Sequence, residues 1–126
     1  MSGERVLVVE DNEMNMKLVR DILQATGYSP LEASSGEQAL ALAVENAPAL
    51  VLMDMQLPDI DGTEALQRLR SDERTAGIPV LALTAQAMQG DRERFLAAGF
   101  DGYLSKPVDV DELIAAVRRY CDGGTE

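Results

Sequence analysis

Positions 49–54 hold five apolar residues that lead directly into a single carboxylate, in the order AlaLeuValLeuMetAsp. Pro58 and Gly62 follow within a few residues and indicate a loop. A short apolar run that ends at turn residues is typical of a strand buried on both faces of a sheet. Asp54 would then lie at the carboxyl end of this strand, where open α/β sheets bind their ligands. We therefore take Asp54 as the candidate reaction centre.

Strand-like and helix-like segments alternate along the whole chain. The expected strands are 5–10, 28–33, 49–54, 78–84 and 101–105. The expected helices run from Asn12 to Gly27, from Ser35 to about Asn46, after Asp61, over 88–98 and after Asp109. Pro30 favours an edge position for the second strand. Five such units with short connections predict a doubly wound parallel sheet with helices on both faces, since a barrel needs about eight units.

Cap residues and apolar stripes predict the limits and inner faces of the helices. Ser35 with Gln38, and Asp61 with Glu64, have the spacing of capping boxes. The expected N-caps are Asn12, Ser35, Asp61 and Asp109, and the expected helix stops are Gly27 and Gly99. The inward stripes are expected at Leu18, Val19, Ile22 and Leu23, at Ala65, Leu66 and Leu69, and at Val110, Leu113, Ile114, Val117 and Cys121.

The length and the hydropathy pattern favour a single domain in the cytoplasm. A chain of 126 residues can bury one substantial core, which we expect over about 5–121, followed by a polar tail at 122–126. No stretch approaches the roughly 18 apolar residues of a membrane span, and the N-terminus does not read as a secretory signal. We therefore expect a cytoplasmic protein with no membrane contact.

The composition excludes several kinds of chemistry. The chain has no histidine and one cysteine, so histidine-dependent catalysis, histidine-bound zinc and an internal disulfide are ruled out. A net charge of −11 argues against direct nucleic-acid binding, which depends on Lys and Arg. Acidic side chains must therefore carry any chemistry, and Cys121 reads as an ordinary apolar helix residue.

Polar residues lie at the ends of four of the five expected strands. Glu10 ends the first and Asp11 follows it, Asp54 ends the third, Thr84 ends the fourth and Lys106 follows the fifth. If the central strands are neighbours, these side chains meet at one edge of the sheet. Crowded carboxylates repel one another unless a cation neutralises them, and ligands that are all oxygen point to Mg²⁺ or a similar hard ion such as Mn²⁺.

These residues resemble the receiver domain of bacterial two-component response regulators. The resemblance covers Arg5 to about Cys121 and rests on four motifs: the Glu10–Asp11 pair, Asp54 with LeuProAspIleAspGly after it, Thr84–Ala85, and TyrLeuSerLysPro at 103–107. It implies a flavodoxin-like sheet with strand order 2-1-3-4-5, the order known for the chemotaxis member of this family.

The resemblance also implies a role for each site residue. Asp54 would be the phosphoacceptor, taking a phosphoryl group from a phosphohistidine of a histidine kinase or histidine phosphotransfer protein. Mg²⁺ would be held by Asp11, Asp54 and the backbone carbonyl of Gln56, with Glu10 acting through a water. Thr84 and Lys106 would face the phosphoryl oxygens. The Lys106–Pro107 peptide is expected to be cis.

The output of such a protein would be a changed surface. Phosphorylation would draw Thr84 inward and make room for the ring of Tyr103, altering the face formed by the fourth helix, the fifth strand and the fifth helix. We further hypothesise that Gln56 and Gln86 tune the lifetime of the aspartyl phosphate. Asp59 and Asp61 are expected to cap and solubilise their loop rather than to bind metal.

Several alternatives remain open from the sequence. The MetSerGlyGlu start favours a stand-alone receiver. We expect such a receiver to be a monomer or weak dimer with an unidentified downstream protein partner. A receiver excised from a hybrid histidine kinase or larger regulator is the second interpretation. A phosphohydrolase with an Asp nucleophile is the third interpretation. Such an enzyme requires a second acid two residues after the nucleophile, where this chain has Gln56. A binding module that never uses phosphate is a fourth.

Overall fold

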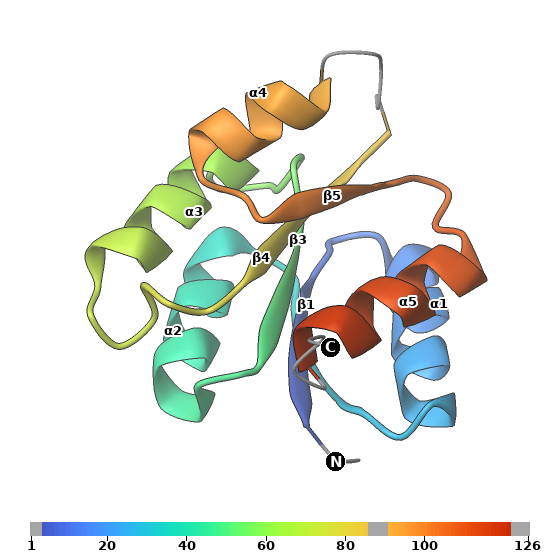
Figure 1. The fold of residues 1–126 in the computed structure, drawn as a ribbon. Coiled ribbons are helices and arrows are strands. Elements are labelled where there is room, and N and C mark those ends of the chain that lie inside the picture. The colour runs from blue at the N-terminus through green and yellow to red at the C-terminus, as the bar shows by residue number, and fades with distance from the viewer. Residues whose placement is uncertain (1–3, 86–90, 122–126) are drawn as a thin grey trace.

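The computed structural model describes residues 4–85 and 91–121, which form one parallel sheet flanked by helices (Figure 1). The strands are β1 (Arg5–Val9), β2 (Ser29–Ala33), β3 (Leu50–Asp54), β4 (Val80–Thr84) and β5 (Gly102–Ser105). The helices are α1 (Glu13–Ala25), α2 (Gly36–Asn46), α3 (Gly62–Ser71), α4 (Asp91–Ala98) and α5 (Val110–Cys121). The strand order is β2-β1-β3-β4-β5, which confirms the flavodoxin-like fold predicted from the sequence.

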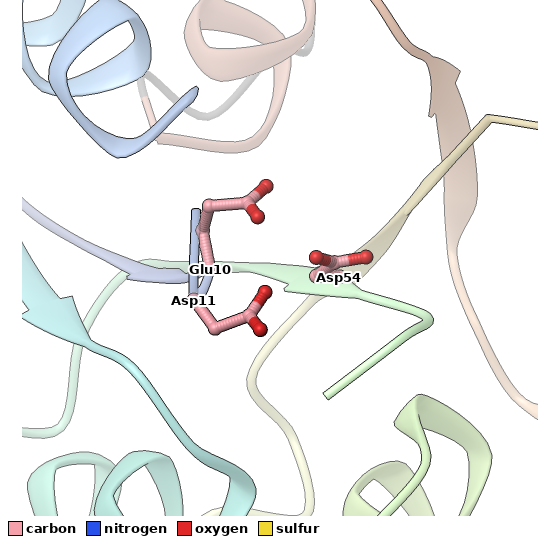
Figure 2. Close-up of side chains that lie close together, drawn as sticks. All are labelled: Glu10, Asp11 and Asp54. Atoms are coloured by element: carbon pink, nitrogen blue, oxygen red, sulfur yellow. The ribbon is translucent and has the colours of Figure 1, made fainter. Parts of the chain in front are cut away.

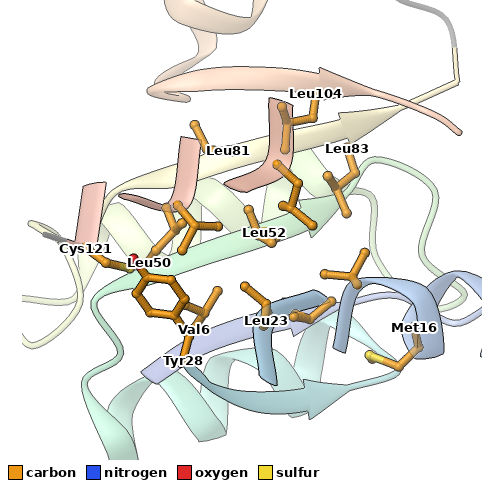
Figure 3. Packing of buried hydrophobic residues seen from close by; sticks show 14 residues of the cluster. Val6, Met16, Leu23, Tyr28, Leu50, Leu52, Leu81, Leu83, Leu104 and Cys121 are labelled. Atoms are coloured by element: carbon orange, nitrogen blue, oxygen red, sulfur yellow. The ribbon is translucent and has the colours of Figure 1, made fainter. Parts of the chain in front are cut away.

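Alternate residues of the central strands supply two separate cores. Val6 and Val8 of β1 face α1 and α5, whereas Leu7 and Val9 face the side covered by α2, α3 and α4. This two-sided burial explains why the strands read as continuous apolar runs. Figure 3 shows the first core, where Leu23 of α1 and Cys121 of α5 pack over the sheet. Pro30 lies in β2, which is an edge strand as predicted.

The four predicted N-caps all accept a backbone hydrogen bond at the start of their helices. The donors to Asn12, Ser35, Asp61 and Asp109 are the amides of Asn15, Gln38, Glu64 and Glu112. Gly27 and Gly99, with φ of 94° and 112°, follow α1 and α4 as predicted. One capping box was wrong in detail: the Gln38 side chain accepts from the Ser34 amide, one residue before the cap.

Several predicted boundaries and inward positions were also wrong. Strands β2, β3, β4 and β5 each begin one or two residues later than predicted, and β1 ends one residue earlier, at Val9. Leu18 and Val110 are 39% and 45% exposed, because Met16 takes the inward place on α1 and Val108 contacts the core ahead of α5. The predicted start of the fourth helix at Met88 and the tail at 122–126 lie outside the described residues. No described helix is both long and apolar enough to cross a membrane.

Candidate functional site

The register of the sheet brings the polar ends of the strands together. Val9 pairs with Met53, so Glu10 and Asp54, the next residue of each chain segment, lie side by side at the carboxyl edge. On the other side of β3, Asp54 pairs with Leu83, and Thr84 follows. Parallel pairing therefore aligns residues that are far apart in sequence, as the pattern of strand ends predicted.

Three carboxylates form a cluster at this edge. Oxygen atoms from Glu10, Asp11 and Asp54 all lie within 4.8 Å of one another. Figure 2 shows the Glu10 and Asp11 carboxylates projecting from the end of β1 toward Asp54. Glu10 and Asp54 are each only 3% exposed, whereas Asp11 is exposed and gives the cluster its opening to solvent. Such a group of hard oxygen donors fits Mg²⁺ or Mn²⁺.

Lys106 lies against two of these carboxylates. Its ammonium is 2.9 Å from Asp54 Oδ2 and 3.0 Å from Glu10 Oε1. The lysine is placed by strand pairing, since its amide donates to the Thr84 carbonyl at 2.8 Å. The Lys106–Pro107 peptide is cis, as predicted. One ammonium does not balance three carboxylates, so the cluster retains the electrostatic demand for a further cation.

Burial and hydrogen bonds shift the pKa of two groups in this cluster. Desolvation is the largest cause that raises the pKa of Glu10 above its usual value, and the hydrogen bond with Asp54 raises it further. The hydrogen bond with Lys106 lowers the pKa of Glu10, but this effect is smaller than the other two combined. Desolvation alone would lower the pKa of Lys106, but hydrogen bonds with Asp54 and Glu10 outweigh it, so the pKa of Lys106 is raised. The lysine therefore stays cationic over the physiological range.

Backbone amides hold the two buried carboxylates from their other sides. The Gln56 amide donates to Asp54 Oδ1 at 3.0 Å, and the Asn12 amide donates to Glu10 Oε2 at 3.1 Å. Asp54 is thus held between an amide on Oδ1 and an ammonium on Oδ2. A carboxylate fixed in this way has one defined orientation relative to the neighbouring pocket.

A pocket of about 190 Å³ opens beside Asp54. Its walls include Asp54, Gln56, Thr84, Lys106 and, from α4, Arg94 and Phe95. Thr84 is 8% exposed at this wall. The sequence does not assign Arg94 or Phe95 to the site, and Arg94, within AspArgGluArg, is typical of a solvated helix face. Only the packing of α4 against the sheet brings them to the pocket.

The sequence also singled out residues that do not belong to the carboxylate cluster. Tyr103 is half-buried on β5, and its ring centroid lies 5.5 Å from that of Phe95. The Gln56 side chain is exposed. Gln86 lies outside the described residues. Asp61 caps α3, and Asp59 accepts hydrogen bonds from the start of α2, so both serve as capping residues.

Comparisons with known proteins agree on one family. The model of the family described as response regulator receiver domain matches residues 6–118. The polar-differentiation response regulator DivK of Brucella ovis is 48% identical over 115 residues, which cover 91% of this chain and 94% of that protein.

Solved structures give the same result. The receiver domain of a sensor histidine kinase from Pseudomonas aeruginosa, with a magnesium ion coordinated in its active site cleft, is 37% identical with a TM-score of 0.87; the match covers 96% of this chain and 99% of that one. The receiver domain of the Saccharomyces cerevisiae response regulator Ssk1, crystallised with the histidine phosphotransfer signaling protein Ypd1, is 28% identical with a TM-score of 0.87, over 99% and 93% of the two chains.

Proposed function

The chain belongs to the family of response regulator receiver domains, and on that premise we propose that Asp54 is its phosphoacceptor. The observation that carries the proposal is the position of Asp54. Its carboxylate lies between the Lys106 ammonium and the Gln56 amide and faces a pocket of about 190 Å³. Glu10 is also buried beside Lys106, but it does not line the pocket that Asp54 shares with Thr84 and Lys106.

The transfer itself requires little of the protein beyond positioning and charge. A carboxylate oxygen of Asp54 forms a bond to phosphorus while the bond from phosphorus to the donor imidazole nitrogen breaks. The electron pair of the broken bond stays on the imidazole. Lys106 and the Thr84 hydroxyl, on the walls of the same pocket, stabilise the negative charge of the phosphoryl oxygens.

A divalent cation completes the site. Asp11, Asp54 and the backbone carbonyl of Gln56 would hold Mg²⁺, or Mn²⁺, as hard oxygen donors, and Glu10 would act through a water. When bound, the cation supplies neutralisation of the charge that builds on the phosphoryl group. The excess of carboxylate over ammonium charge in the cluster supports this assignment, as does the magnesium ion in the related kinase receiver.

The donor we propose is a phosphohistidine on a histidine kinase or histidine phosphotransfer protein. The related Ssk1 receiver was crystallised with a phosphotransfer protein, and the present chain has no histidine that could act as an internal donor. The downstream partner is a protein rather than nucleic acid, in keeping with the net charge of −11. A monomer or weak dimer, in the cytoplasm, stays the prediction for the free protein.

Thr84 and Tyr103 are the proposed switch. Thr84 lines the pocket beside Asp54, and Tyr103 packs on Phe95, which lines the same pocket. A movement of Thr84 toward a phosphoryl group would therefore be transmitted through α4 to β5. The resulting population shift changes the α4-β5-α5 face and needs only a few kcal/mol of differential stabilisation.

Two kinds of protein could carry this function: a stand-alone regulator, or a hybrid kinase that contains the receiver. The match covers 94% of DivK and 99% of the kinase receiver chain, so both a stand-alone regulator and a receiver within a hybrid kinase are consistent in length. We favour a stand-alone regulator, because the identity to DivK is the higher of the two, 48% against 37%. In either case the chain signals rather than turns over external substrates.

Labelling with acetyl phosphate tests the proposal. Wild type with Mg²⁺ should take up one phosphoryl group per chain, and Asp54→Asn should take up none. Intact-mass spectrometry gives the stoichiometry, and borohydride reduction of the acyl phosphate identifies the labelled residue. Multiple turnover of varied phosphoesters would instead identify a phosphohydrolase, and a wild-type chain that no donor labels would identify a module that does not use phosphate.

A further inference from the structure

The loop between β3 and α3 is tied to the start of α2. Asp59 Oδ1 accepts a hydrogen bond from the Gly36 amide at 2.9 Å, and Asp59 Oδ2 accepts one from the Glu37 amide at 3.0 Å. These amides belong to the first turn of α2, which has no partners for them within the helix. Ser35 caps the same helix locally through the Gln38 amide. The N-terminus of α2 is thus capped twice, once from its own chain segment and once from the loop after Asp54.

Steric contact reinforces this connection. A Cβ atom on Gly36 would overlap Ile60 Cγ1 and would lie 3.4 Å from Asp59 Oδ1. The Ile60 side chain therefore occupies the space that a side chain at position 36 would fill. Ile60 also packs against the core on this side of the sheet. Asp59 and Ile60 thus give the loop both a polar and an apolar contact with α2.

The two ends of the loop also lie close together, where α3 begins beside the end of β3. The Gly62 amide donates to the Met55 carbonyl at 3.3 Å, and a Cβ atom on Gly62 would lie 2.9 Å from the Asp54 carbonyl oxygen. Gln56 lies between this closure and the Asp59 attachment. Its amide contacts Asp54 Oδ1, and its carbonyl is the proposed backbone ligand of the cation. The conformation of Gln56 therefore depends on both attachments.

The Asp59 attachment has a favourable electrostatic contribution as well. Hydrogen bonds from the Glu37 and Gly36 amides hold the pKa of Asp59 below its usual value, although the carboxylate is exposed. A negative charge at the N-terminus of a helix also interacts favourably with the helix dipole. Asp59 is thus ionised at neutral pH, and its charge is directed at α2.

We propose that Asp59 is a positioning residue for the cation site: its double hydrogen bond to α2 holds the loop so that Gln56 stays beside Asp54. This inference rests on the proposed function, because it assumes that the carboxylate cluster binds a divalent cation. Loss of the attachment weakens cation binding and slows labelling when the cation is limiting. It leaves the labelling rate at saturating cation unchanged, because Asp59 touches no reacting atom.

The test compares Asp59→Ala with two controls that also lose an N-cap. Ser35→Ala removes the local cap of α2 and leaves the loop attached, and Asp61→Ala removes the cap of α3. Free Mn²⁺, followed by electron paramagnetic resonance, measures cation affinity without any phosphoryl donor. Circular dichroism and urea titration establish that each variant is folded and how far its stability has fallen.

We expect Asp59→Ala to bind Mn²⁺ about tenfold more weakly than wild type, the range found for residues that orient metal ligands. Ser35→Ala and Asp61→Ala should bind it within about twofold of wild type. Asp59→Asn, which keeps one carbonyl acceptor for α2, should fall in between. With acetyl phosphate, Asp59→Ala should need a correspondingly higher Mg²⁺ concentration for half-maximal labelling and then reach the wild-type rate.

Two results would overturn the inference. One is wild-type Mn²⁺ affinity in Asp59→Ala; the other is an equal loss of affinity in Ser35→Ala, which would reduce Asp59 to a general stabiliser of α2. If wild type binds Mn²⁺ but takes no label, the proposed function fails while the Mn²⁺ comparison still decides the role of Asp59. A wild type without Mn²⁺ affinity would overturn both.

Discussion

The Lys106 ammonium lies 2.9 Å from Asp54 Oδ2, and both side chains are largely removed from solvent, with 18% and 4% of their surfaces exposed. The same ammonium contacts Glu10. Lys106 therefore compensates the charge of two buried carboxylates in the absence of a divalent cation. The arrangement that we propose for stabilising a phosphoryl group would thus stabilise the fold when no phosphoryl group is present.

Replacement of Lys106 by methionine should reveal this second role. The change leaves two buried carboxylates without a cationic partner, so we expect the free energy of unfolding at pH 7 to fall by about 3 kcal/mol. Loss of the lysine also raises the pKa of Glu10 further. A raised pKa gives stability that is present at low pH and lost as the pH rises, so the deficit should shrink between pH 7 and pH 5. Urea titrations at both pH values measure it, and an unchanged midpoint at pH 7 would contradict it.

The attachment of Asp59 to α2 should depend on pH in the opposite direction. Its pKa is lowered in the folded state, so its contribution to stability is full above the unfolded value of 3.8 and is lost as the pH falls through the folded pKa. The destabilisation caused by Asp59→Ala should therefore be complete at pH 6 and decline toward pH 2. Ser35→Ala is the control, because its hydroxyl does not titrate and its effect should stay constant. Urea titrations across this range compare the two variants.

A methyl group at Gly62 should disturb the site through the backbone. The added Cβ would lie 2.9 Å from the Asp54 carbonyl oxygen, which cannot move away as the end of a flexible side chain can. We expect Gly62→Ala to lower the free energy of unfolding by about 2 kcal/mol and to slow labelling of Asp54. Gly77→Ala is the matched control, since nothing lies within 4 Å of its Cβ position. Equal stability of the two variants in thermal unfolding would contradict the expectation.

Arg70 connects segments at the opposite edge of the sheet. Its guanidinium donates to the carbonyls of Ala76, Ile78 and Gly99 and to the Asp101 carboxylate. Arg70→Met should therefore cost about 2 kcal/mol in chemical denaturation, because it leaves partly buried acceptors unsatisfied.

The control for Arg70 is an arginine on the surface. Arg74 pairs with Asp72 and holds the pKa of that carboxyl at about 2, but both groups are solvated. Arg74→Met should leave the denaturation midpoint unchanged. A similar loss in both arginine variants would show that charge number, rather than the Arg70 hydrogen bonds, sets stability.

The two glutamines should affect how long the aspartyl phosphate lasts. The exposed Gln56 side chain follows Asp54 by two residues, and Gln86 follows Thr84 by two. We hypothesise that their side-chain amides orient or obstruct the water that hydrolyses the aspartyl phosphate. Gln56→Ala and Gln86→Ala should therefore change the half-life of the phosphorylated protein several-fold. Decay of the label after removal of donor measures the half-life, with Gln67→Ala on the exposed face of α3 as the control. An unchanged half-life in both site variants would remove the hypothesis.

The amino-acid sequence by itself determined the order of strands and helices, the caps and the residues at the strand ends. Local patterns decide these features: apolar runs mark strands buried on both faces, and Asn12, Ser35, Asp61 and Asp109 bond to amides three residues away. The strand ends then converge because parallel strands share one carboxyl edge.

Only the tertiary structure decided which contacts join distant segments. Asp59 caps a helix that begins 23 residues earlier in the chain, and Arg70 binds Asp101 across 31 residues. Arg94 reaches the pocket because α4 packs over that end of the sheet, and Leu18 is exposed because Met16 fills the inward position. Such contacts depend on how whole elements pack against one another, which hydrogen-bond spacing and apolar periodicity along one segment do not specify.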